Sequence, residues 1–276
     1  MKIKLLSPLW GQEHLPLEKF LHKVKDAGYD GVDTWLPGNP ADKKLLFDFL
    51  QKHELHLVAH QHEAHGTTFK EFKASYIENL HACAEPQPLL INSHTGRDYF
   101  SFEENLELVD AAQEVSEHTG VVILHETHRG RVGYSPQMTT AFFESRKDFL
   151  ITADFSHWVC VTESMLDNFS SIVEEAILRT RYIHARVGFE EGPQVNDPRA
   201  PEWQYALDKF LGWWDRMVAV NAGLGTGILP ITTEFGPPPY MPTHPYTKAP
   251  VSDQFTINCF MKDLVKKRYG QFFSGS

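Results

Sequence analysis

Four side chains able to bind a metal follow apolar, strand-like runs in the second half of the chain. The runs cover 121–124, 149–153, 182–183 and 228–233, and they lead into Glu126, Asp154, His184 and Glu234. A carboxylate at the end of a buried strand is costly unless a partner neutralises it. Three carboxylates and one imidazole suit a divalent cation of intermediate hardness, such as Mn, Co, Mg or Zn. Any one of these residues alone is explained as a polar strand end, but four in the same position predict one divalent metal site.

The candidate ligands must be positioned by regular secondary structure. The sequence provides it as eight strand-like runs that alternate with helix-like segments. Strands are predicted over 3–10, 31–36, 55–60, 88–92, 121–126, 149–154, 181–185 and 227–234, and helices over 17–27, 40–52, 67–84, from 101, from 135, and over 162–180, 201–220 and 251–268. Short connections in this order require parallel strands with right-handed crossovers. We therefore expect one α/β domain over residues 1–276, a TIM (β/α)8 barrel, with a doubly wound open sheet as the alternative. The carboxyl ends of barrel strands share one mouth, so the four ligands should converge there.

The composition of the chain disfavours some classes of binding partner. The net charge is −10 and the pI is about 5.8, which disfavours nucleic acid and anionic membranes. The three cysteines have no metal-type spacing, and no apolar stretch approaches the roughly 20 residues of a membrane helix. We expect a reduced, cytoplasmic protein without disulfides, and a homo-oligomer is compatible with the sequence.

The ligand order resembles that of a known superfamily. Glu126, the Asp154-x-x-His157 motif, His184 and Glu234 are similar in order to the metal ligands of the xylose isomerase-like barrels, which include ketose 3-epimerases, sugar-phosphate isomerases, inosose dehydratases and the AP endonucleases of DNA repair. The resemblance implies that the four ligands bind a metal and that Glu126 and Glu234 also act as the acid/base pair. It further implies that His157 contacts substrate and that Arg186 anchors a hydroxyl or phosphate.

The function expected from this resemblance is a metal-dependent isomerase or epimerase acting on a small sugar or sugar phosphate, through an enediolate. Two alternatives are an AP endonuclease-type phosphodiesterase and an inosose dehydratase-type lyase. The endonuclease branch carries a further Asp-x-His pair after the strand of His184. This chain has Asp197-Pro198-Arg199 instead, which argues against a three-metal cluster, as does the acidic net charge.

Further histidines fall near predicted strand ends. His60, His62 and His94 are candidates for extra ligands, substrate contacts or polar lining of the mouth. We expect His62 and His94 to bind substrate. For His128 and Arg129, a solvated loop is favoured over a ligand contact.

Aromatic residues and one loop complete the candidate pocket. Trp10, Trp35 and Trp158 either form an apolar wall against a sugar face or pack in the core. The proline-rich segment 236–250 follows the last ligand directly and is predicted to be a rim or lid, because long loops at this face often cover substrate.

Overall fold

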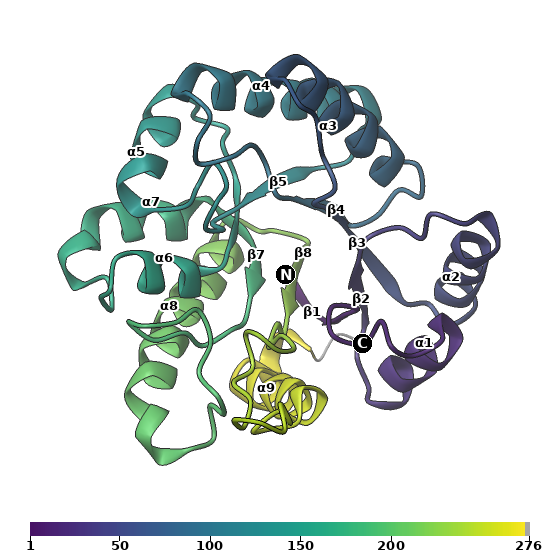
Figure 1. The fold of residues 1–276 in the computed structure, drawn as a ribbon, viewed down its shortest axis with the longest axis vertical. Coiled ribbons are helices and arrows are strands. Elements are labelled where there is room, and N and C mark those ends of the chain that lie inside the picture. Colours follow the sequence, from purple (N-terminus) through teal and green to yellow (C-terminus); the bar gives the residue numbers. More distant parts are fainter. Residues whose placement is uncertain (274–276) are drawn as a thin grey trace.

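A closed parallel barrel forms the centre of the molecule (Figure 1). The computed structural model describes residues 1–273, and within them every strand pairs with the next one in the chain and β8 returns to β1. The strands are β1 (Lys2–Pro8), β2 (Gly31–Thr34), β3 (His56–Gln61), β4 (Leu90–Ser93), β5 (Ile123–Glu126), β6 (Ile151–Ala153), β7 (Thr180–His184) and β8 (Ile228–Thr232). The predicted TIM barrel is confirmed, and the open sheet is excluded because β1 and β8 are paired.

Helices surround the barrel (Figure 1). They are α1 (Leu17–Asp26), α2 (Pro40–Lys52), α3 (Phe69–Ala84), α4 (Phe102–Thr119), α5 (Pro136–Ser145), α6 (Phe155–Val161), α7 (Ser170–Arg179), α8 (Gln204–Gly223) and α9 (Gln254–Arg268), with 3-10 turns η1 (Asp167–Phe169), η2 (Pro201–Trp203) and η3 (Gly270–Phe272). A capping box begins α4, since Ser101 Oγ accepts from the Glu104 N–H and Glu104 accepts from the Ser101 N–H. Among the described residues, no helix has both the length and the hydrophobicity to cross a membrane. The three cysteines are free, as expected.

The helix predicted over 162–180 differs from the observed structure. The chain turns into α6 directly after Asp154, and a separate helix, α7, begins only at Ser170. The Asp154 side chain explains the early start, because Oδ1 accepts from the Ser156 N–H at 3.0 Å and from Ser156 Oγ at 2.5 Å. Asp154 therefore ends β6 and caps α6, so a candidate metal ligand also fixes the local backbone.

The barrel interior supports the mouth from below. A cluster of Leu6, Val58, Leu90, Leu124 and Tyr182 is buried. Because side chains on a strand alternate between its two faces, the residue two positions further along points the same way. Leu124 thus lies below Glu126, and Tyr182 lies below His184. Apolar packing fixes the height and direction at which these site residues emerge.

Gly31 of β2 pairs with His56 of β3 at close range, which gives a first prediction. A Cβ at this position would lie 2.1 Å from the carbonyl oxygen of His56. Gly31→Ala should therefore lower the free energy of unfolding by about 1–3 kcal/mol, since backbone must move to relieve the clash. Urea denaturation measures the change. Gly212→Ala in α8 is the matched control, because a Cβ there meets nothing within 4 Å. Equal stability of the two variants would contradict this account of β2–β3 packing.

Candidate metal centre

The four predicted ligands converge at the carboxyl mouth of the barrel. Glu126 and His184 are the last residues of β5 and β7, Asp154 directly follows β6, and Glu234 lies two positions after β8. One ligand atom from each lies within 4.8 Å of the ligand atoms of the other three. All four side chains are buried, with exposed fractions of 0 to 7%. The spacing and burial are those of a single coordination shell.

Three buried atoms in this group have no hydrogen-bond partner, namely His184 Nδ1, His184 Nε2 and Glu234 Oε2. His184 Nδ1 lies 2.8 Å from Glu234 Oε2 and 3.5 Å from Glu126 Oε1. Neither His184 Nδ1 nor Glu234 Oε2 makes a hydrogen bond of acceptable geometry. Buried polar atoms rarely remain unpaired, so atoms that converge without bonding one another fit a shared cation.

Charge leads to the same conclusion. Arg186 Nη2 forms a short ion pair with Asp154 Oδ2 and lies 3.6 Å from Glu234 Oε2. One guanidinium against the three carboxylates leaves two negative charges, which is the charge that a divalent cation neutralises. Asp154 has both oxygens engaged, so a metal would share Oδ2 with Arg186.

The pKa values of both Asp154 and His184 are raised in this group of carboxylates. Burial raises the pKa of Asp154 to about 6, against the lowering effect of Arg186 and with a further rise from Glu234 and Glu126. Burial acts to lower the pKa of His184, but the charges of Glu234 and Glu126 prevail and hold it well above the usual value. Protons would therefore compete with a metal ion for Asp154 and His184.

Asp33 is a site residue that the sequence analysis missed. It lies on β2, across the mouth from β7, with Oδ2 3.2 Å from His184 Nε2. Tyr182 Oη donates to the same oxygen at 2.5 Å. Asp33 therefore orients His184 so that Nδ1 faces the carboxylates, an arrangement common behind metal-bound histidines. The available signal was a carboxylate inside the predicted strand 31–36, although no long apolar run precedes it.

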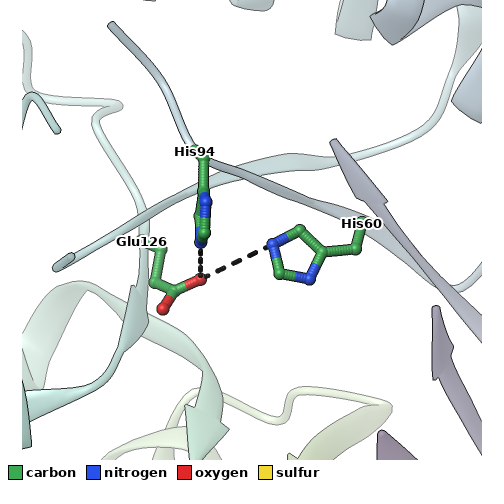
Figure 2. A group of neighbouring side chains, drawn as sticks. All are labelled: His60, His94 and Glu126. Carbon is green, nitrogen blue, oxygen red and sulfur yellow. Dashed lines mark hydrogen bonds and ion pairs between the residues drawn. The ribbon is translucent and has the colours of Figure 1, made fainter. Parts of the chain in front are cut away.

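A second group capable of holding a metal lies beside the first (Figure 2). His94 Nε2 lies 3.0 Å from Glu126 Oε2, and His60 Nε2 lies 4.0 Å from the same oxygen. Asn92 Nδ2 also donates to Glu126 Oε2 at 2.7 Å. Glu126 is thus shared, with Oε1 toward His184 and Oε2 toward the two histidines. His60 was considered from the sequence, whereas Asn92 was not.

The open part of the mouth is a cavity of about 340 Å³. Its lining includes the predicted substrate contacts His62, His94 and Arg186, the aromatic residues Trp10 and Trp35, and Glu234, Tyr240, Asp33, His60, His128, Glu13 and Pro8. Tyr240 comes from segment 236–250, so this predicted rim does border the pocket. Trp158 does not, because it is fully buried and stacks on Phe155.

His128 and His157 occupy positions that differ from those predicted from the sequence. His128, expected in a solvated loop, lines the cavity, and its ring centroid is 4.4 Å from that of His94 and 3.9 Å from that of His157. His157, expected to contact substrate, is fully buried and its Nε2 accepts from Arg186 Nη2 at 2.8 Å. In this geometry His157 positions Arg186, which itself faces the cavity.

Comparison with solved structures shows what the fold is similar to. D-allulose 3-epimerase from Methylomonas sp. superposes with a TM-score of 0.65 at 15% identity, covering 97% of this chain and 98% of that chain. The chain shares the barrel fold of this epimerase. The Escherichia coli 3-keto-D-glucoside 4-epimerase gives 0.62 at 14% identity (96% and 100% covered), and Thermus thermophilus endonuclease IV gives 0.52 at 13% (86% and 94%). No protein-family model and no curated protein sequence matches the chain.

The protonation of the ligands predicts how metal binding depends on pH. A cation binds the deprotonated groups, so the proton on His184 must leave on binding, and below about pH 6 a proton on Asp154 must leave as well. Affinity for Mn²⁺ or Co²⁺ should rise with pH, more steeply below pH 6 than above it. Calorimetry of metal-free protein in buffers of different ionisation enthalpy counts the released protons. Binding without proton release between pH 5 and 8 would be incompatible with these ligands.

Substitution of Asp33 tests whether its contact with His184 Nε2 strengthens metal binding. Asp33→Asn keeps the shape of the side chain but removes the charge facing His184 Nε2. Affinity for a divalent metal should fall by about 10- to 100-fold with unchanged stoichiometry. Competition with a chelating dye measures this. Asp30→Asn is the control, since Asp30 precedes the same strand at its amino end and accepts from the Leu5 N–H at 2.9 Å. A similar loss in both variants would show a general effect on β2.

Proposed function

We propose that this protein is a divalent-metal-dependent isomerase or epimerase of a small sugar or sugar phosphate. The observation that carries the proposal is the convergence of Glu126, Asp154, His184 and Glu234, with His184 Nδ1 and Glu234 Oε2 buried and unpaired. The cavity above them has the size of a monosaccharide site, and Trp10 and Trp35 offer apolar faces to a sugar ring. Two of the solved structures with this fold are sugar epimerases.

The proposed chemistry divides into metal and side-chain roles. A divalent ion held by the four ligands would act as a Lewis acid toward a carbonyl and the adjacent hydroxyl of the sugar. One of Glu126 and Glu234 takes the proton from the carbon next to the carbonyl, and the electron pair of that C–H bond forms the enediolate. The other returns a proton. Return to the opposite face of the same carbon gives an epimer, and return to the neighbouring carbon gives an isomer.

The surrounding residues fit these two carboxylate roles. Glu126 is held on one side by Asn92 and His94. Glu234 follows β8, the strand that pairs with the strand of His184, and borders the cavity directly. The two carboxylates come from β5 and β8, so they approach a bound sugar from different sides. Arg186 lies between Asp154 and the cavity and is placed to donate to a substrate oxygen.

Exchange of the Glu126 and Glu234 carboxylates for amides tests the acid/base roles. Glu126→Gln and Glu234→Gln should each lower turnover by about 10²- to 10⁴-fold. In deuterated solvent, one variant should still exchange the proton next to the carbonyl, because a single base can remove and return it on one face. Glu13→Gln, which also lines the cavity, is the matched control. Full turnover by either ligand variant would exclude the role assigned to it.

A substrate screen tests the reaction class. Metal-free protein is supplied with Mn²⁺, Co²⁺, Mg²⁺ or Zn²⁺ and offered ketoses, ketose phosphates and inososes. Epimer or isomer formation supports the proposal, whereas loss of water from an inosose would support the lyase alternative. No turnover with any metal bound would count against both.

One observation favours a second candidate, metal-assisted phosphodiester cleavage. The His60, His94 and Glu126 group offers a further metal position next to the first (Figure 2), and endonuclease IV shares the fold. Against it, Asp197 is paired with Arg199 through two contacts of 2.8 and 2.6 Å, so it is engaged outside the ligand group. Elemental analysis separates the candidates, because one metal per chain fits the isomerase and three with cleavage of abasic DNA fit the nuclease.

A further inference from the structure

Three arginines at the carboxyl face of the barrel lack a countercharge. Within residues 1–273, no carboxylate oxygen lies within 4.0 Å of Arg97, Arg129 or Arg131. Six of the other seven arginines have such a partner: Arg146, Arg179, Arg186, Arg199, Arg216 and Arg268. The seventh, Arg181, lies in β7 at the opposite end of the barrel. In a protein of net charge −10, three unpaired arginines in the loops after β4 and β5 are a local excess of positive charge.

Two of these arginines, Arg97 and Arg131, lie on loops that contact each other. The loops are joined by the Val132 N–H, which donates to the Thr95 carbonyl oxygen at 3.0 Å. Arg97 stacks on the Phe72 ring at 4.7 Å and donates to the carbonyl oxygens of Gly96 and Ala64 at 2.8 and 3.1 Å. These contacts tie Arg97 to the loops after β3 and β4 and leave its charge unneutralised.

Arg131 itself is poorly satisfied. Its Nε is buried without a partner, and Nη1 makes one long hydrogen bond of 3.4 Å to the Gly130 carbonyl oxygen. Burial, and next the charge of Arg97, lower its pKa to about 10, while Glu126 and Asp98 oppose the change from beyond ion-pair distance. A buried arginine donor without an acceptor lowers the stability of the folded protein, and a bound anion that accepts its hydrogen bonds offsets this cost.

His62 lies two residues before Ala64, whose carbonyl oxygen accepts from Arg97. His62 lines the cavity wall and its Nδ1 is buried without a partner. Burial, and then the charges of His94 and Arg131, lower the pKa of His62, with Glu63 acting in the other direction. The Arg97–Ala64 and Val132–Thr95 hydrogen bonds therefore bring the loops that carry His62, Arg97 and Arg131 together at one side of the cavity.

We propose that Arg131, together with Arg97 and His62, forms an oxyanion subsite at the rim of the cavity, for a phosphate or carboxylate group at the far end of the substrate. This inference rests on the proposed function, because the rest of that substrate would lie over the metal centre. The planar, forked guanidinium matches the oxygens of both groups. A phosphate monoester is the better match to two arginines, since it carries more charge and three acceptor oxygens.

Direct binding of inorganic phosphate to metal-free protein tests the subsite without turnover. Wild-type protein should bind one phosphate by calorimetry, and Arg131→Met should weaken this by about 10- to 100-fold. Arg181→Met is the matched control, because Arg181 also lacks an ion pair and donates to the Leu178 and Thr180 carbonyl oxygens far from the cavity. Its affinity should stay within about twofold of wild type. Equal affinity in Arg131→Met and wild type overturns the proposal.

Two further measurements keep the test decisive. Where Arg131→Met fails to give a cooperative melting transition, Arg131→Lys replaces it, and weaker phosphate binding than in Arg181→Met supports the subsite while equal binding overturns it. Competition then separates the two oxyanions. A ketose phosphate that displaces phosphate at least about tenfold better than the unphosphorylated ketose assigns a phosphate, and the same advantage for a uronate assigns a carboxylate. No advantage for either overturns the proposal, whatever the enzyme does with metal and sugar.

Discussion

The structure depends on the cost of burying three carboxylates within coordination distance of one another. Glu126, Asp154 and Glu234 repel each other in a part of the mouth that water barely reaches. Arg186 and a protonated His184 offset part of that repulsion in the absence of metal. A divalent cation in place of the proton on His184 would neutralise the two negative charges that Arg186 leaves on the three carboxylates. The same residues thus set the charge of the mouth and form the candidate metal centre.

The barrel explains how such a costly arrangement stays in place. Glu126 and His184 end strands whose preceding inward side chains, Leu124 and Tyr182, are packed in the interior. The bond from Tyr182 to Asp33 then ties β7 to β2 across the mouth, and Asp33 turns His184 toward the carboxylates. Apolar packing in the barrel interior fixes the height of these side chains in the mouth, and a few polar contacts fix their orientation. Precision at the centre is thus a property of the whole barrel rather than of the loops.

The sequence predicted the site residues where a metal-binding side chain directly follows an apolar, strand-like run. Apolar runs that end in a carboxylate or imidazole predicted both the barrel and the four converging residues, because parallel strands place their carboxyl ends together. Asp33 was missed since its strand shows no long apolar run, and its partner His184 is about 150 positions away in the chain. His128 was assigned to solvent because local polarity says nothing of rings brought in from neighbouring loops. The start of α6 was missed because Asp154 has two roles, cap and candidate ligand, and only one was weighed.

The pairing of β1 with β8 has a consequence for how the protein matures. Lys2 through Leu6 lie in register with Ile228 through Thr232, so β1 gains this partner only after β8 has been made. Until then the sheet has two free edges, and Glu234, carried just beyond β8, is not yet in the mouth. Contacts between such distant segments form late in folding. The four candidate ligands can consequently come together only when the barrel closes, so the candidate metal centre is assembled at the end of folding.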